Sequence, residues 1–233
     1  MRAEPRVWRF GTTERRLHTI HAVAFTVLLA TGFVLYLPLL AQIFSDRPLM
    51  KAIHLVAAVG WITALMLVLV LGDRAALRRT RREIERFDED DLLFVRRRPA
   101  AAGRFNGGQK AHAVLEAGLS ALFVVSGALL WLGERNTELR LPGTIALHDA
   151  ATLLLAVLVL GHIGKATSQP GSLEGIRRGT VTASYAAEHH AKWQPQDAAG
   201  GRAPLPLFRV AAAAVVAAAG LLTAVLLARD VLG

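Results

Sequence analysis

The amino-acid sequence predicts an all-α integral membrane protein, with a four-helix transmembrane bundle followed by an additional C-terminal transmembrane helix. Its 233 residues are 53% hydrophobic and have a mean hydropathy of +0.39, which is more apolar than an ordinary soluble domain. The apolar residues gather in blocks of about twenty residues, the length that an α-helix needs to cross a bilayer. Five such blocks are present, at residues 18–40, 53–71, 111–132, 144–164 and 207–228.

The order of the blocks predicts the domain organisation. The first block is too long for the apolar region of a secretory signal peptide and lacks a small-residue cleavage site, so we expect it to be retained. The first four blocks predict a four-helix domain over residues 1–195. Proline and glycine are frequent at residues 196–206, which is typical of a linker, and residues 207–228 then form the extra transmembrane helix.

Positive charge alternates between the two ends of the blocks. Of the 27 Lys and Arg residues, 22 lie in the N-terminal tail, residues 73–110 and residues 165–209. The positive-inside rule then places the N-terminus and the 73–110 loop in the cytoplasm and the C-terminus on the outer side of the membrane. The net charge of +9 is explained by this topology and by contact with anionic membrane lipids, so no nucleic-acid partner is expected.

The chain contains no cysteine. Disulfides, thiolate-ligated iron–sulfur clusters and thioether-attached haem are therefore excluded. A metal centre in this chain would use histidine, methionine or carboxylate ligands.

Two histidines of the fourth block, His148 and His162, are fourteen residues apart. In an α-helix this spacing rises about 21 Å and returns to within about 40° of the same face. One helix therefore presents two imidazoles on one side, one near each membrane surface. This geometry suits two metal centres stacked across a membrane.

Each of these histidines has a second histidine at its own depth on another predicted helix. His18 lies near the cytoplasmic surface, like His162, and His54 lies near the outer surface, like His148. Two imidazoles at equal depth are suited to bis-histidine ligation of haem iron. An amphipathic residue at the membrane interface is an equally good interpretation of any single one of the four. Two depth-matched pairs favour ligation.

The remaining histidines leave alternatives open. His21 shares the helix face of His18 and is its rival as a ligand. His112, at the start of the third block, is a third candidate near the cytoplasmic surface. His189 and His190 lie in polar sequence, where we expect them to be solvated or to face a partner.

Other polar residues fall inside the apolar blocks. Glu116, in the third block, either passes protons to an inner site or extends toward the cytoplasmic loop. The pairs Thr31-Gly32 and Ser126-Gly127 make the first and third blocks similar to each other. Ordinary small-residue helix packing explains these pairs, and close approach of a flat cofactor is the alternative.

A polar motif, Arg-Phe-Asn-Gly-Gly-Gln-Lys at residues 104–110, precedes the third block on the same side of the membrane as His18 and His162. Glycine allows a ligand to approach the backbone, while Asn106 and Gln109 offer donors and acceptors to a carbonyl group. A polar, glycine-rich helix start is the plainer alternative.

Together these motifs resemble the membrane cytochrome b (gamma) subunit of respiratory formate dehydrogenase. The resemblance covers about residues 8–195. The residues and motifs that carry it are His18 with Thr31-Gly32, His54, the 104–110 motif, the His148/His162 pair, and His189-His190-Ala191-Lys192-Trp193.

The resemblance implies a four-helix bundle that holds two b haems. His54 and His148 would ligate the outer haem, and His18 and His162 the inner haem. A quinone would bind beside the inner haem. The residues implied in quinone binding are Asn106, Gly108, Gln109 and His162.

The resemblance also implies partners. Electrons would arrive from an iron–sulfur subunit on the outer side, supplied by a catalytic subunit with molybdenum or tungsten. They would cross the membrane and reduce quinone, which takes its protons from the cytoplasm. This chain would be the electron-transfer subunit of the oxidoreductase complex and would oxidise no substrate of its own.

The chain departs from the family pattern at three places. Thr19 follows His18 where the family has an aromatic residue, and Leu55 follows His54 where it has proline; neither change prevents ligation. The helix at residues 207–228 is extra, and we expect it to pack on the bundle or to replace contacts of a partner's membrane anchor.

Two other functions remain open from the sequence. The same chemistry fits the cytochrome subunit of a membrane-bound hydrogenase or of another quinone-linked oxidoreductase. A different class is a haem-free membrane scaffold or a proton-coupled transporter. A long inverted repeat is not evident, which disfavours the transporter.

Overall fold

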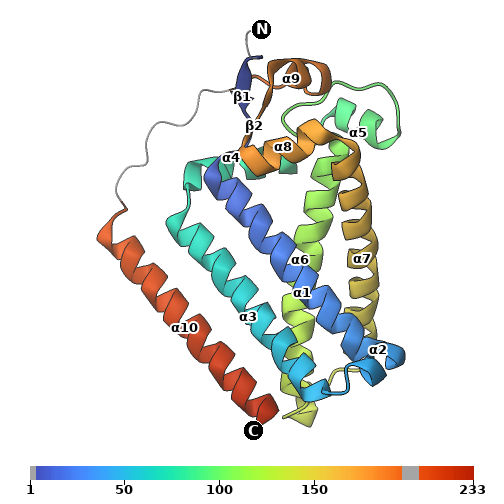
Figure 1. Cartoon of the computed structure of the whole chain (residues 1–233), viewed down its shortest axis with the longest axis vertical. Helices are drawn as coiled ribbons and strands as arrows, with labels where there is room; N and C mark the ends of the chain where they lie inside the picture. The colour runs from blue at the N-terminus through green and yellow to red at the C-terminus, as the bar shows by residue number, and fades with distance from the viewer. Residues whose placement is uncertain (1–3, 196–204) are drawn as a thin grey trace. The chain divides into compact units, whose positions relative to one another are not determined.

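The computed structural model describes residues 4–195 and 205–233, which are almost entirely helical (Figure 1). Four of the predicted blocks lie within one long helix each, whereas the first, residues 18–40, extends past the end of its helix at Tyr36 into a second, short helix that begins at Pro38. The five long helices are long and apolar enough to cross a membrane. The prediction of an all-α membrane protein with an extra C-terminal helix is confirmed. The long helices are α1 (Thr12–Tyr36), α3 (Arg47–Leu71), α6 (Gly107–Gly133), α7 (Thr144–Ser168) and α10 (Leu207–Leu232).

Short elements precede or connect the long helices. Two of them are strands, which the sequence analysis did not predict, and they pair antiparallel with Val7 opposite Val181. The short elements are β1 (Arg6–Trp8), α2 (Pro38–Ile43), α4 (Arg74–Glu85), α5 (Glu89–Val95), the 3₁₀ turn η1 (Thr137–Leu139), α8 (Pro170–Arg178), β2 (Thr180–Thr182) and α9 (Ala183–His189).

The chain forms two compact units, and the boundary between them falls within α1. One unit comprises Met1–Arg15 and Ala75–Gly200, and so contains the small sheet, α6 and α7. The other comprises Arg16–Arg74 and Gly201–Gly233, and so contains most of α1 together with α3 and α10. Most of the predicted linker, residues 196–204, lies outside the described residues, and the predicted domain boundaries stay a prediction.

In the second of these units, α10 packs along α3. Gly220 lies so close to Thr63 that a side chain at residue 220 would clash with it. Arg209 donates hydrogen bonds to the carbonyl oxygens of Val70 (2.6 Å) and Gly72 (2.7 Å) at the end of α3. Because the carbonyl end of a helix carries partial negative charge, this arginine stabilises the end of α3 and fixes the start of α10 beside it.

In the other unit, α6 and α7 pack against each other and run antiparallel. Asn106 begins α6 with a capping box, in which its side chain and that of Gln109 each accept a backbone N–H of the other. Gly143 precedes α7 with a φ of 81°, a left-handed conformation that favours glycine. The short connection through η1 brings the end of α6 next to the start of α7.

Candidate functional site

His54 of α3 is held by a hydroxyl group of α1. Its Nδ1 lies 2.8 Å from Thr31 Oγ1, and the same hydroxyl donates a hydrogen bond to the carbonyl oxygen of Val27 at 2.8 Å. Thr31 is buried. The next residue, Gly32, leaves room beside the ring, because a Cβ there would lie 3.6 Å from His54 Cε1, an ordinary contact distance.

His148 of α7 has the same arrangement with α6. Its Nδ1 lies 2.8 Å from the Oγ of buried Ser126, which also donates a hydrogen bond to the carbonyl oxygen of Leu122 at 2.7 Å. A Cβ at Gly127 would lie 3.7 Å from His148 Cε1. Phe123 packs edge-on against the imidazole, with ring centroids 5.2 Å apart. The similarity between the first and third blocks therefore corresponds to two equivalent histidine contacts.

At its other end, α7 contacts α6 through a second histidine. The ring of His162 stacks on that of His112, with centroids 4.7 Å apart and an interplanar angle of 11°. His112 Nε2 lies 3.5 Å from Glu116 Oε2, one turn further along α6. The structure thus brings a carboxylate, a second imidazole and the predicted ligand His162 together in one row.

The predicted ligand pairs draw one histidine from each unit. His18 and His54 belong with α1 and α3, whereas His148 and His162 belong with α6 and α7. Both pairings therefore stay predictions. The rival ligand His21 donates from Nδ1 to the carbonyl oxygen of Leu17 at 2.9 Å and packs edge-on against aromatic rings of α1 and α3.

Arg104, the first residue of the 104–110 motif, is buried and holds three segments together. Its guanidinium forms ion pairs with Glu14 of α1 (2.7 Å) and Glu83 of α4 (2.6 Å), and it donates to the carbonyl oxygen of Arg9 (3.1 Å). Two carboxylates around one buried guanidinium compensate its desolvation. The first cation of the motif is therefore an internal structural group.

Lys110, the last residue of the motif, is also buried. Its ammonium pairs with Asp91 of α5 at 2.5 Å and donates to the carbonyl oxygen of Arg86 at 2.8 Å. A Cβ at Gly107 would clash with the backbone of Asp91, so glycine is required there by the close approach of α5. The two ends of the motif are thus fixed by ion pairs and packing.

Between these anchors, Asn106 and Gln109 keep part of their side chains for other contacts. Asn106 Oδ1 accepts from the Gln109 backbone at 2.9 Å, and Gln109 Oε1 accepts from the Asn106 backbone at 3.1 Å. Because a backbone N–H needs an acceptor, the oxygen atoms of both amides are committed to the helix start. Their NH₂ groups remain as donors. The aromatic ring of Phe94 would lie 3.1 Å from a Cβ at Gly108, so this glycine is partly covered.

The expectation for His190 was wrong, because it is buried rather than solvated. Its Nδ1 donates to the carbonyl oxygen of Gly103 at 2.7 Å, directly before the motif. Burial, assisted by the positive charge of Arg9, lowers the pKa of His190 to about 4. His189 is more exposed and stacks on Tyr185. The neutral ring of His190 therefore holds the backbone of Gly103, directly before residues 104–110, through this hydrogen bond.

The segment after His190 is bonded to the loop that precedes α6. Lys192 donates to Asp88 at 2.9 Å and also pairs with Asp90, while its backbone N–H donates to the carbonyl oxygen of Ala102 at 3.0 Å. These charge partners raise the pKa of Lys192. The late histidine-containing segment thus holds the loop before α6 in place.

Arg9 was missed by the sequence analysis. It is almost fully buried, and burial lowers the pKa of its guanidinium to about 10. It donates to the carbonyl oxygen of Arg104 at 2.9 Å and lies 3.5 Å from Gln109 Oε1. Nothing in the sequence separates this arginine from the others of the basic N-terminal tail, because its burial depends on segments about a hundred residues away.

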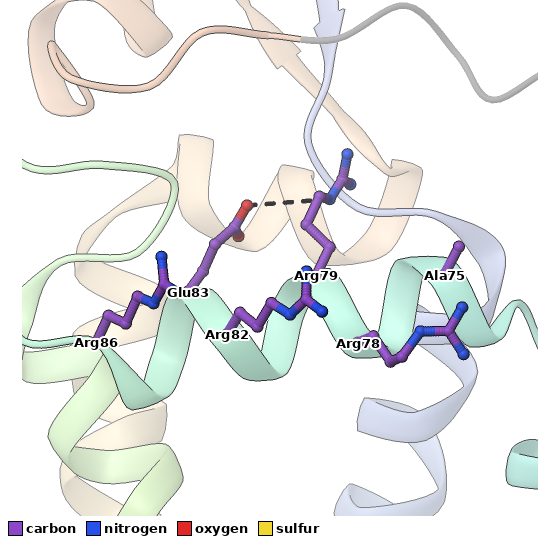
Figure 2. A pocket seen from close by; sticks show the side chains of 6 residues that line it. All are labelled: Ala75, Arg78, Arg79, Arg82, Glu83 and Arg86. Carbon is purple, nitrogen blue, oxygen red and sulfur yellow. Dashed lines mark ion pairs between the residues drawn. The ribbon is translucent and has the colours of Figure 1, made fainter.

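A basic hollow of about 480 Å³ lies along α4 (Figure 2). Glu83 points toward Arg79, with 3.9 Å between the paired atoms. The lining contains three further arginines, so its net charge is positive. The chain passes from the end of α3 to α4 through only Gly72 and Asp73, so this charge lies next to the end of an apolar helix. The hollow is lined by Ala75, Arg78, Arg79, Arg82, Glu83 and Arg86.

The histidines fit a haem iron in their chemistry. His54 and His148 are held at Nδ1 by neutral hydroxyl groups, which suits neutral imidazole as an iron ligand. Without cysteine, bis-histidine ligation of noncovalently bound haem is the arrangement that this donor set supports. The adjoining glycines add no bulk beside either ring.

Residues 9–173 match the family model of prokaryotic cytochrome b561. The chain belongs to this family. Membership in the prokaryotic cytochrome b561 family agrees with the helices and histidines described above. It implies that the chain is a multi-pass membrane cytochrome with haem b.

Curated relatives support a more specific similarity. The chain is 23% identical to the formate dehydrogenase cytochrome b556(fdo) subunit of Escherichia coli, over 83% of this chain and 94% of the relative. It is 25% identical to the formate dehydrogenase cytochrome b556 subunit of Haemophilus influenzae, over 83% and 84%. The nitrate-inducible cytochrome b556(Fdn) subunit of E. coli is 21% identical, over 77% and 86%. The resemblance inferred from the sequence motifs is thus confirmed.

Proposed function

We propose that this chain is the membrane-anchoring cytochrome b subunit of a formate dehydrogenase and that it carries electrons to membrane quinone. The observation that carries the proposal is the repeated contact in which a buried hydroxyl holds a histidine, once on α1–α3 and once on α6–α7. Together with family membership and the formate dehydrogenase relatives, it supports a cytochrome rather than a scaffold or a transporter.

Four histidines hold two b haems in this proposal. His54 and His148 ligate the outer haem, and His18 and His162 ligate the inner one, so that α7 contributes one ligand to each. When bound, the haems supply reversible one-electron transfer between ferric and ferrous iron. The protein sets the distance between the two centres through the fourteen residues that separate His148 from His162.

Quinone binds at the 104–110 motif. The NH₂ groups of Asn106 and Gln109 donate hydrogen bonds to a quinone carbonyl, with Gly108 beside them and His162 as the neighbouring ligand. The capping box supports this role because it orients both amides by their oxygen atoms. Reduction of one quinone to quinol takes two electrons and two protons. In this proposal Glu116 and His112 deliver those protons, because Glu116 contacts His112, which stacks on His162.

The positive charges support the orientation. The basic N-terminal tail, the hollow on α4 and residues 104–110 face the cytoplasm, and the C-terminus is periplasmic in the bacterial inner membrane. The arginines along α4 then lie at the level of the lipid headgroups and contact anionic lipids. Electrons enter from a partner iron–sulfur subunit on the periplasmic side, supplied by a molybdenum- or tungsten-containing catalytic subunit that oxidises formate.

The test is haem quantitation on the chain purified from membranes of cells that make haem. We expect two low-spin b haems per polypeptide in the dithionite-reduced minus oxidised spectrum. One haem would contradict the two-pair ligand set, and a folded, haem-free chain would contradict the cytochrome assignment. In membranes that retain the partners, formate should reduce the haems. Reduction by hydrogen but not by formate would identify a hydrogenase partner instead.

A further inference from the structure

The two histidines predicted to ligate the outer haem share one local structure. Each is bonded at Nδ1 by a buried hydroxyl from the preceding long helix, Thr31 for His54 and Ser126 for His148. We propose that Thr31 and Ser126 are positioning residues, which fix the tautomer and the ring plane of these two ligands. This proposal rests on the haem ligation proposed above.

The direction of the hydrogen bonds follows from counting protons. A hydroxyl has one proton and can donate only once. Ser126 Oγ lies 2.7 Å from the carbonyl oxygen of Leu122, four residues earlier on α6. Two oxygen atoms at that distance repel unless a proton lies between them. The hydroxyl proton therefore goes to the carbonyl, and Ser126 accepts a hydrogen bond from the Nδ1–H of His148.

Thr31 leads to the same result on α1. Its hydroxyl lies 2.8 Å from the carbonyl oxygen of Val27 and 3.3 Å from that of Leu28, and either carbonyl takes the proton. The Nδ1–H of His54 then donates to Thr31 Oγ1. A neutral imidazole protonated at Nδ1 carries its lone pair on Nε2. In both rings, Nε2 is therefore the atom that can ligate iron.

This arrangement has consequences for the iron. An acceptor at Nδ1–H increases the basicity of the ligating nitrogen and stabilises the ferric state. A threonine or serine hydroxyl stays neutral throughout the physiological pH range. The orienting bonds at the outer site therefore add no proton uptake of their own to its reduction.

The experiment removes each hydroxyl with the smallest available change in side-chain volume. Thr31→Val and Ser126→Ala are purified with haem and titrated potentiometrically, and their ferric EPR spectra are recorded, because the lowest-field feature reports the orientation of the two ligand planes. We expect the potential of one haem to rise and its EPR feature to shift, while the other haem is unchanged. The affinity for the affected haem should fall roughly 10- to 100-fold.

Matched variants separate positioning from general packing. Thr26→Val removes a hydroxyl of α1 that donates a hydrogen bond to the carbonyl oxygen of Ala22, and it should leave both potentials unchanged. Thr31→Ser and Ser126→Thr keep the hydroxyl and should restore the parental spectrum. If both hydroxyl-free variants retain two haems with unchanged potentials and EPR features, the positioning proposal is overturned while the haem proposal stands. Absence of haem from the parental chain would instead overturn the proposed function.

Discussion

The two ends of the α6–α7 helix pair hold their histidines by different chemistry. At one end, His148 meets the hydroxyl of Ser126, which does not titrate in the physiological range. At the other end, His162 stacks on His112, which in turn faces the carboxylate of Glu116. The same pair of helices thus offers a hydroxyl contact at one end and an imidazole–carboxylate contact at the other.

This difference matches what the two ends have to do under the proposed function. Electron entry from a protein partner requires a stable iron potential and no proton. Quinone reduction requires a proton for every electron. The end with Glu116 also carries the 104–110 motif, which is anchored by buried ion pairs. If the ends are divided in this way, substitutions at each end should have separable effects on haem content, quinone reduction and stability.

Removal of either α7 ligand should have a different consequence at each end. We expect His148→Ala to lose the outer haem, and His162→Ala to lose the inner haem together with quinone binding. The measurement is haem per polypeptide combined with binding of a quinone analogue. Two haems retained in either variant would refute the ligand assignment for that end.

Loss of the buried arginine of the motif should destabilise only the end that carries it. Arg104→Gln leaves Glu14 buried without its main charge partner, which costs about 3–5 kcal/mol. The measurement is the thermal unfolding midpoint in detergent, together with the local hydrogen-exchange rate of α6. Arg81→Gln is the control, because its exposed pair with Glu85 is worth less than about 1 kcal/mol. Equal effects of both variants would contradict the structural role of Arg104.

Low pH should destabilise the segment around His190, which is hydrogen-bonded to Gly103 directly before the 104–110 motif. Its folded pKa of about 4 lies below the usual 6.5, so the opened segment binds the proton first. The stabilisation is complete above pH 6.5 and is lost as the pH falls toward 4, by up to about 3 kcal/mol. The hydrogen-exchange rate of residues 183–193, corrected for the intrinsic rate, should therefore be higher at pH 5 than at pH 7. In His190→Asn, which keeps a donor for the carbonyl of Gly103, this extra pH dependence should disappear.

Glu116 should affect quinone reduction and leave haem binding unchanged. We expect Glu116→Gln to slow quinol formation about a hundredfold or more, the effect typical of a lost proton-transfer group. Glu134→Gln places the same change at the opposite end of α6 and should have no such effect. The measurement is the quinone reduction rate at constant haem content. A rate equal to that of the parental chain would remove Glu116 from the proton route.

The smallest expected effect concerns lipid contact along α4. Arg78→Gln combined with Arg82→Gln removes two cations from the basic hollow, each worth about 1 kcal/mol near an anionic surface. Native mass spectrometry should then show less retained phosphatidylglycerol and cardiolipin, and unchanged phosphatidylethanolamine. Arg135→Gln, at the other end of α6, is the control. Unchanged retention of anionic lipid would exclude this hollow as a headgroup site.

Much of the fold could be predicted because it depends on local composition. A run of about twenty apolar residues can only be accommodated as a helix in a bilayer, and this predicted all five long helices. The strands β1 and β2 could not be predicted, because each is short and they pair across 174 residues. The burial of Arg9 and His190 was missed for the same reason, since their partners lie about ninety residues or more away.

The sequence by itself determined the number of membrane helices, the spacing of His148 and His162, and the similarity between Thr31-Gly32 and Ser126-Gly127. Each of these is set by periodicity or composition along one helix. Only the tertiary structure decided that Thr31 and Ser126 contact histidine rings, and that His112 stacks on His162. Those contacts depend on the register of α1 relative to α3 and of α6 relative to α7. A shift of one residue along either pair would bring a different side chain to each ring.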